Sequence, residues 1–354
     1  MKIGLDLRFI ENDLYSEFVI ELIEILTYTD QENHYVIYTN SKWEIEETNN
    51  TTIKYVWIEN GSLKEQFHFL KVLKKDNNNI MIFFNHYKPL WYKGEYYLIV
   101  PSLKDVYYSN FSSLIEKYKN VFLLEKNLKN ASKVICFDDN TKSELIERFN
   151  IKEEKINILP AFFKQYAKKD VNTLQVDVKT KYQIWNDFFV YSGWEWIEKN
   201  LEKLIYVFEK LKNTKDLHLI FIWDEVSKNI PLRNLVVQYT IQDRVKFLWD
   251  IKDSDKHFIY KQSKGAIFPS LYETFPFHMA EPLHFDTPIL ASNFKSIKNI
   301  FWDTIEYFSP ISKSSILTSI DTFIDKKNKK IDYKNIKNTY TRENTVQSLL
   351  EIIK

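Results

Sequence analysis

Two glutamates, Glu273 and Glu281, are separated by seven residues in the segment GAIFPSLYETFPFHMAEPLHFDTPILASN. The apolar run 265–270 predicts a buried strand, and Pro276 suits the first position of the helix that follows. Glu273 is then expected in the loop after the strand, and Glu281 about one turn into the helix. Both carboxylates can therefore border one crevice, and there they could accept hydrogen bonds from a ligand.

Lys199 is the cation that could complete such a site. It lies in YSGWEWIEKNLEKLIYVFEKL, where a predicted strand ends at the turn of Gly193 and an amphipathic helix follows. A lysine at a helix N-terminus suits a diphosphate, because the helix dipole and the ammonium group both attract negative charge. The ordinary alternatives are an exposed lysine and two glutamates on a solvated loop and helix, since Glu-x7-Glu alone is common by chance.

The elements that must position these residues alternate along the chain, which predicts right-handed βαβ units and parallel sheets. The length of 354 residues suits two domains. The residues from Thr141 to Glu144 predict a capping box. Residues 162–177 are predicted to form a linker, and residues 326–335 a solvated surface turn. Strands are predicted at 2–7, 34–38, 54–58, 80–84, 97–100, 133–137, 155–159, 188–191, 218–222, 245–248, 266–269 and 289–291, and helices at 18–27, 63–74, 116–130, 141–149, 199–211, 254–262, 277–285, 314–324 and 343–353.

The order PS-x-x-E, Phe, seven residues between the glutamates, then P-I-L-x-S resembles the donor-site signature of retaining nucleotide-sugar glycosyltransferases of family four. The resemblance covers about residues 185 to 310 well and the remainder loosely. It implies an α/β protein with the GT-B fold, in which two Rossmann-like domains face each other across a cleft. The implied parts are an acceptor-side domain at 1–165, a donor domain at 166–335 and a C-terminal helix at 336–354 that returns to the first domain.

The same resemblance implies roles for residues of the second half. Glu273 would approach the donor sugar, Glu281 would hold the ribose hydroxyls and Lys199 would contact the donor diphosphate. Gly193, Phe275 and Phe277 are expected to complete the donor-binding residues.

In the first half, VPSLKDVYY resembles a strand end that carries His-Asp in many relatives. Lys104 stands where that histidine would be and Asp105 follows it, so both are candidate catalytic residues. A lysine cannot replace a neutral imidazole at pH 7 unless its pKa is lowered. His86, at another strand end, is a weaker candidate with a structural role as its alternative.

The implied activity is transfer of a sugar from a nucleoside diphosphate donor to a hydroxyl of a glycan or lipid-linked acceptor, with retention of configuration. No cofactor and no metal are expected, because Lys199 and backbone groups would carry the charge. The net charge of +1 gives no reason to expect a nucleic acid partner. Without a signal peptide or membrane span the protein is expected in the cytoplasm, with a possible peripheral membrane contact and Cys136 as a buried reduced thiol.

Departures from the signature favour a second hypothesis, a catalytically degenerate GT-B-like binding or scaffold protein. FIENDLYSEF lacks the glycine-rich loop of the first domain, and Trp194 and Glu198 occupy the positions where a second cation is usual. An epimerase of the same fold is a third alternative, but it needs more acid and base residues. Within the signature itself, the residues that replace the usual ones are Thr274, Pro276, His278, Pro282 and Asp286.

The tryptophans give a separate hypothesis. The chain has nine Trp but five Gly, and four tryptophans stand where turns of the family have glycine: Trp196, Trp223, Trp249 and Trp302. Such turns need glycine for steric reasons. We therefore predict that the organism reads the codon UGA as glycine and that these positions were translated as tryptophan. Real divergence, in which the indoles fill a degenerate site, is the alternative.

Overall fold

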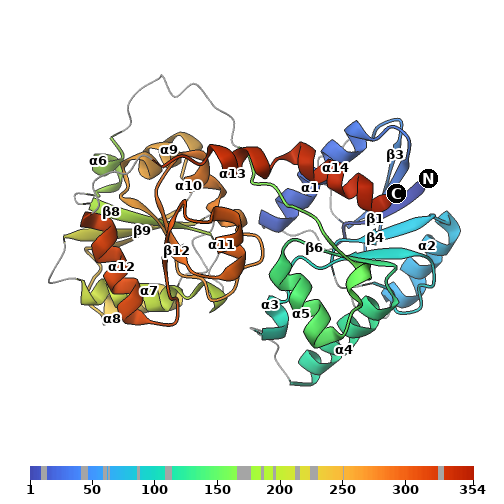
Figure 1. Ribbon diagram of the computed structural model, residues 1–354, viewed down its shortest axis with the longest axis horizontal. Coiled ribbons are helices and arrows are strands. Elements are labelled where there is room, and N and C mark those ends of the chain that lie inside the picture. Colours follow the sequence, from blue (N-terminus) through green and yellow to red (C-terminus); the bar gives the residue numbers. More distant parts are fainter. Residues whose placement is uncertain are drawn as a thin grey trace. The chain divides into compact units, whose positions relative to one another are not determined.

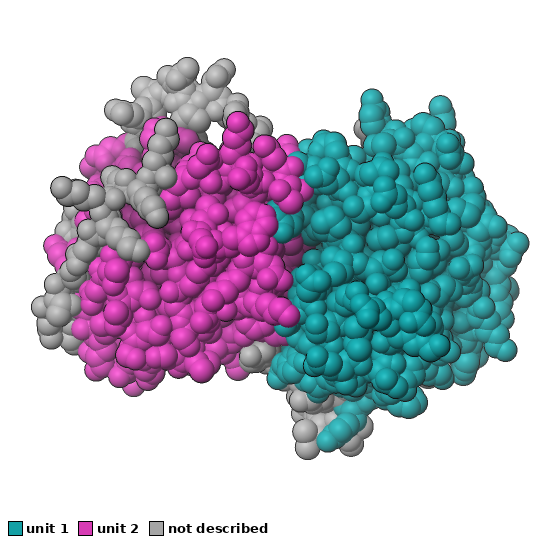
Figure 2. Space-filling model, viewed as in Figure 1, with its two compact units in different colours: residues 1–162, 340–354 teal, residues 163–339 magenta. Residues whose placement is uncertain are grey.

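The computed structural model divides into two compact units, residues 1–162 with 340–354 and residues 163–339 (Figure 2). The expected boundaries lay a few residues away from these. The structure describes residues 1–8, 14–40, 47–58, 62, 64–85, 88–107, 114–165, 177–184, 187–193, 197–211, 216–223, 230–249, 251–325 and 331–354. No helix in these ranges is long and apolar enough to cross a membrane.

The first unit is built on a parallel sheet of seven strands in the order β3-β2-β1-β4-β5-β6-β7. Its central strands are buried apolar runs, as expected for a parallel sheet covered on both faces. They are β1 (Lys2–Asp6), β2 (His34–Thr39), β3 (Thr51–Tyr55), β4 (Ile80–Phe83), β5 (Tyr96–Ile99), β6 (Lys133–Cys136) and β7 (Ile156–Ile158).

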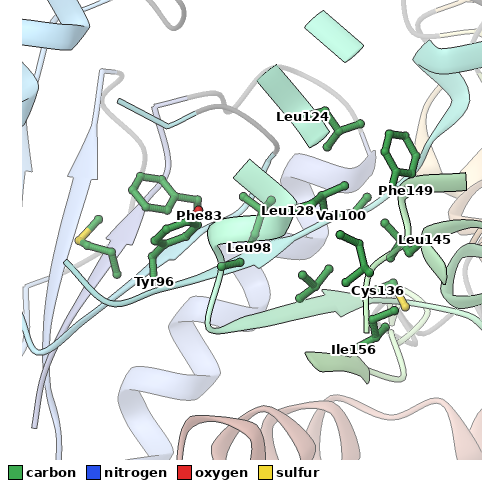
Figure 3. Close-up of a cluster of buried hydrophobic side chains, with 14 of the residues drawn as sticks. Phe83, Tyr96, Leu98, Val100, Leu124, Leu128, Cys136, Leu145, Phe149 and Ile156 are labelled. Atoms are coloured by element: carbon green, nitrogen blue, oxygen red, sulfur yellow. The ribbon is translucent and has the colours of Figure 1, made fainter. Parts of the chain in front are cut away.

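Helices cover the faces of this sheet (Figure 1). A core cluster that includes Phe83, Leu98 and Cys136 fills the space beneath them (Figure 3). Cys136 is a buried free thiol, as predicted, and burial raises its pKa to about 12. The helices are α1 (Leu14–Thr29), the π-helix η1 (Glu65–Phe69), α2 (Leu70–Asp76), α3 (Lys104–Tyr107), α4 (Leu114–Asn130), α5 (Asp139–Phe149), the short η2 (Glu153–Lys155) and the C-terminal α14 (Arg342–Ile353).

The C-terminal helix α14 belongs to the first unit although it follows the second in sequence. It packs on α1, where Arg342 pairs with Glu21. The Thr345 hydroxyl donates a hydrogen bond to the carbonyl of Pro160 at 2.5 Å. The chain thus returns to the unit in which it began.

The second unit has a parallel sheet of six strands in the order β10-β9-β8-β11-β12-β13. The direction of the strand order reverses between β8 and β11, and ligands of open α/β sheets bind beside the carboxyl ends of strands at such a point. The strands are β8 (Asp187–Ser192), β9 (Leu217–Trp223), β10 (Val245–Trp249), β11 (Gly265–Phe268), β12 (Ile289–Ser292) and β13 (Glu306–Phe308).

Helices surround this second sheet as well (Figure 1). Together, the two parallel sheets and their helices give the Rossmann-like α/β architecture that the sequence predicted for each half. The helices are α6 (Val178–Tyr182), η3 (Ile197–Lys199), α7 (Leu201–Lys210), α8 (Ile230–Gln238), α9 (Asp253–Gln262), η4 (Phe277–Met279), α10 (Ala280–His284), α11 (Lys295–Phe301), α12 (Lys313–Asp325) and α13 (Lys334–Thr339).

Some local predictions were wrong. Strand β3 lies three residues earlier than expected because Tyr35 of β2 pairs with Thr51. Helix α5 is capped by Asp138, whose carboxylate accepts from the backbone N–H groups of Asn140 at 2.8 Å and Thr141 at 3.0 Å, so the predicted capping box does not open the helix. The expected surface turn at 326–335 runs into α13, while residues 326–330 lie outside the described ranges.

Trp302 adopts a backbone conformation that favours glycine. It follows α11 with φ 44° and ψ −124°, and its side chain is 54% exposed. A side chain in this region is strained, since only glycine enters it freely. Trp249 differs, because it lies in β10 and is absent from the described positions with positive φ. Trp196 and the side chain of Trp223 lie outside the described part, so the decoding hypothesis gains support at residue 302 alone.

Replacing Trp302 with glycine should stabilise the protein made with tryptophan at this position. We expect Trp302→Gly to raise the free energy of unfolding by roughly 1 to 2 kcal/mol, because it relieves a strained positive φ. The matched control Trp249→Gly should lower it, since glycine weakens a strand interior. Urea denaturation measures both changes. A destabilising Trp302→Gly would contradict the strain, and a UGG codon at residue 302 would refute the decoding hypothesis.

Candidate active site

The second unit brings Glu273 and Lys199 together beside the strand-order reversal. Lys199 follows β8, and Glu273 follows β11. The two loops are also joined through the backbone, because the N–H of Leu271 donates to the carbonyl of Glu198 at 2.7 Å. The hydroxyl of Ser296 donates to the carbonyl of Glu273 at 2.7 Å and holds the turn from the other side.

The side chains of Lys199 and Glu273 form a buried ion pair. Lys199 Nζ lies 2.5 Å from Glu273 Oε1, and the two side chains are 13% and 6% exposed. Burial is the largest single effect and would raise the pKa of Glu273, but the charge and hydrogen bond of Lys199, with the other neighbours of the carboxylate, together lower it by more, so the pKa lies below its ordinary value. Glu273 is therefore a carboxylate at neutral pH, fixed in position by its partner.

His278 is the second neighbour of Glu273. Its Nε2 lies 3.4 Å from Glu273 Oε1 and is a buried atom without a hydrogen-bond partner. Burial lowers the pKa of His278 to about 3, although the charge of Glu273 acts in the opposite direction. The ring is therefore neutral at physiological pH, and Lys199 is the cation that faces Glu273.

Gly193 gives the turn after β8 the room that this arrangement needs. Its φ of 126° lies in the region that favours glycine. A Cβ at this position would lie 3.3 Å from the Cβ of His278 and 3.3 Å from the hydroxyl of Tyr191. The backbone therefore approaches His278 closely, and a side chain at residue 193 would crowd this approach.

Glu281 lies in the first turn of α10 and contacts two side chains of α9. Lys256 Nζ donates to Glu281 Oε1 at 3.1 Å, and the Tyr260 hydroxyl donates to Glu281 Oε2 at 2.8 Å. The same hydroxyl lies 2.7 Å from Ser192 Oγ at the end of β8. Ser192 therefore connects the Glu281 network to the turn of Gly193, and both glutamates belong to one region of the unit.

The amino end of α7 lies beside the Lys199–Glu273 pair. Asn200 precedes α7 with a φ of 59°, and its side chain makes no capping hydrogen bond to the helix. Instead its amide donates to the carbonyls of Pro269 and Pro310, both at 3.0 Å. The side chain that usually occupies the first N–H groups of a helix thus points elsewhere, which favours an anion at this end.

The remaining predicted residues divide between the units. Phe275 is buried, with its ring 4.6 Å from that of Phe163 and 4.8 Å from that of the half-buried Phe277. Lys104 opens α3 in the first unit, where its backbone N–H donates to Ser102 Oγ at 3.0 Å. The side chain of Asp105 and all of His86 and Trp194 lie outside the described residues.

Sequence reasoning missed Lys256, Tyr260 and Ser192. Lys256 and Tyr260 are four residues apart on α9, so they share one face, but only the packing of α9 on α10 shows which carboxylate they meet. Within the described residues, no three His, Cys, Asp or Glu side chains are placed to hold a metal ion.

The order of strands and the position of this site define a class of protein. Two solved structures show the same fold over almost their whole length: a glycosyltransferase from Rickettsia africae (TM-score 0.72, 16% identity, 99% of this chain and 97% of that one) and HepE from Anabaena in complex with UDP and glucose (TM-score 0.75, 13% identity, 100% and 99%). The chain therefore has the GT-B fold of these proteins.

Residues 186–340 match the family described as Glycosyl transferases group 1. Among curated proteins, the O-antigen chain mannosyltransferase RfbU of Salmonella typhimurium is 22% identical over 255 residues, which cover 71% of this chain and 67% of that protein. The chain is thus a glycosyltransferase with the GT-B fold, and its second unit is similar to the family described as Glycosyl transferases group 1.

The neutral state of His278 can be measured directly. Its ring should show no titration between pH 5 and pH 8, because burial lowers its pKa to about 3. Proton–nitrogen NMR of histidine rings follows each tautomer with pH, and the spectrum of His278→Gln assigns the signal. A midpoint near the ordinary value of 6.5 would mean that the ring is solvated, and a higher midpoint would mean that it is a charged partner of Glu273.

Proposed function

We propose that this protein transfers a sugar from a nucleoside diphosphate donor to a hydroxyl of a glycan or lipid-linked acceptor, as a retaining hexosyltransferase. The observation that carries the proposal is the meeting of Lys199, Glu273 and the turn of Gly193 where the strand order reverses. The names of similar proteins support it, since one acts as a mannosyltransferase on the O-antigen chain and another binds UDP and glucose.

Lys199 and the amino end of α7 would bind the donor diphosphate. An ammonium group has three N–H donors, and the contact with Glu273 occupies one of them. The others can reach phosphate oxygens, while the first N–H groups of α7 add a positive dipole. This would stabilise the departing diphosphate without a metal ion, because charge at the leaving group is what a transferase of this kind must neutralise.

Glu281 would hold the ribose of the donor. Its two oxygens each meet one donor, Lys256 and Tyr260, but a carboxylate has about four lone-pair positions. Two positions therefore remain for two ribose hydroxyls, and the carboxylate is already fixed in one orientation. Preorganisation of this kind strengthens binding, because no side chain has to be ordered when the ligand arrives.

Glu273 and His278 would face the sugar. Glu273 is an ionised carboxylate that can accept hydrogen bonds from sugar hydroxyls, and the neutral His278 keeps an unpartnered Nε2 beside it. An unpartnered buried nitrogen is costly, so a hydroxyl placed between the two residues would stabilise the site. Lys104 and Asp105 of the first unit remain candidates for contacts with the donor or the acceptor.

One observation favours a second function, that of a binding or scaffold protein without turnover. Each of the two site lysines already faces a carboxylate, Lys199 facing Glu273 and Lys256 facing Glu281, so the four charges cancel. A neutral site attracts a diphosphate less strongly than a cationic one. The two functions differ in turnover, which an assay can measure.

The full-length protein should release nucleoside diphosphate from a sugar donor and build a glycoside. A panel of UDP-glucose, UDP-galactose and GDP-mannose, each with an excess of a saccharide acceptor, tests donor and acceptor together. Proton NMR of the product gives the anomeric configuration, which should equal that of the donor. Product of opposite configuration would refute retention, and tight binding of a donor without any release would favour the scaffold.

The ribose role of Glu281 is tested by removing the hydroxyls as well as the carboxylate. Glu281→Gln should weaken binding of the preferred nucleoside diphosphate by roughly 1.5 to 3 kcal/mol, the range for a hydrogen bond to a charged group. The 2′,3′-dideoxy nucleotide should bind the unaltered protein less tightly than the ordinary nucleotide does. Its affinity should fall little further with Glu281→Gln, because the hydrogen bonds between the ribose hydroxyls and the carboxylate are already absent. Calorimetry measures all four affinities, and fully additive losses would contradict the role.

A further inference from the structure

The helical segment 64–76 of the first unit, formed by η1 and α2 (Figure 1), has two sharply different faces. Its inner side chains, such as Phe69 and Leu73, belong to the core of the unit. Its outer positions repeat at the three- and four-residue spacing of one helical face. We call these exposed residues the basic face: Lys64, Phe67, His68, Lys71, Lys74 and Lys75.

Four of the six residues of the basic face are lysines, and no exposed acidic residue lies between them. Glu65 points inward and is 1% exposed, where it pairs with the guanidinium group of Arg8 at 2.7 Å. The carboxylate of Asp76, at the end of α2, pairs with the ammonium group of Lys54 and accepts a hydrogen bond from the hydroxyl of Tyr38. The positive charge is therefore concentrated on one side of a chain whose net charge is only +1.

Two large exposed aromatic side chains accompany the lysines of the basic face. Phe67 is 60% exposed and Trp91 is 52% exposed, and their rings meet edge to face with centroids 5.4 Å apart. Exposed aromatic rings of this size are unfavourable in water. Tryptophan and phenylalanine beside lysines match the boundary between lipid headgroups and acyl chains, where an indole keeps one polar edge in water.

We propose that the basic face with Trp91 docks on the surface of a bilayer that contains anionic phospholipid. The lysines attract the headgroups, and Phe67 and Trp91 enter the boundary region. Because the apolar side of the segment is held in the core, the helix cannot turn over and insert. The contact is therefore peripheral, reversible and sensitive to salt.

The paired charges elsewhere make this surface distinct. Some lysines of other elements have acidic partners, as the exposed Lys129 has in Glu125 at 2.6 Å and the half-buried Lys142 has in Glu153 at 2.8 Å. The exposed Trp57 also differs from Trp91. Lys54 and Val56 face α2. Successive side chains of an extended chain point to opposite sides, so Trp57 projects away from α2.

Sedimentation of the full-length protein with vesicles tests the proposal. It should bind vesicles of phosphatidylcholine mixed with phosphatidylglycerol, fail to bind phosphatidylcholine alone, and dissociate in high salt. Changing Lys71, Lys74 and Lys75 together to glutamine should weaken partitioning on the order of 100-fold, at roughly fivefold for each lysine near an anionic surface. The same change at Lys126, Lys129 and Lys152, exposed lysines elsewhere in the unit, should have little effect.

The aromatic contribution has its own matched pair. Phe67→Ser combined with Trp91→Ser should weaken binding and abolish the blue shift of tryptophan fluorescence on vesicles, whereas Trp57→Ser should not. Release of nucleoside diphosphate from a water-soluble donor should be unchanged in every variant. Loss of this release in one variant would reveal a folding defect, and its absence in the unaltered protein would mean that the proposed transferase activity is wrong. Equal loss with both lysine triplets, or binding to duplex DNA without binding to vesicles, would overturn the proposal.

Discussion

The buried contact between Lys199 and Glu273 joins two loops that are far apart in the sequence. It can form only because β8 and β11 are neighbours in the sheet, so that both loops leave the same edge. Burying two charges is costly unless they meet in good geometry, and the contact therefore fixes both loops at once. Gly193, His278 and the amino end of α7 take their positions around this pair.

Glu281 depends on a second set of contacts that shares the same edge. Its carboxylate is held by α9, and Ser192 links that arrangement to the strand before Gly193. Both glutamates are thus oriented and supplied with a nearby cation before any ligand arrives. For a reaction that relies on alignment and electrostatics, such order in advance is the main contribution of the protein.

Much of this unit could be predicted because apolar runs mark parallel strands, and the residues after them gather at one edge. Lys199, Glu273 and Glu281 follow this rule. Lys256 could not be predicted, because its partner depends on how α9 packs on α10. The cap of α5 was missed for a local reason: Asp138 and Thr141 both suit the position, and only the path of the backbone selects Asp138.

One contact at the start of the second unit links the path of the chain to the carboxylate of Glu281. Asp255 is 2% exposed and accepts from both Lys181 and Tyr182 of α6, the first helix of this unit. It is followed directly by Lys256, which holds Glu281. A displacement of α6 must therefore carry α9 with it or expose the buried carboxylate of Asp255, so the first helix of the unit and the lysine that holds Glu281 are mechanically coupled.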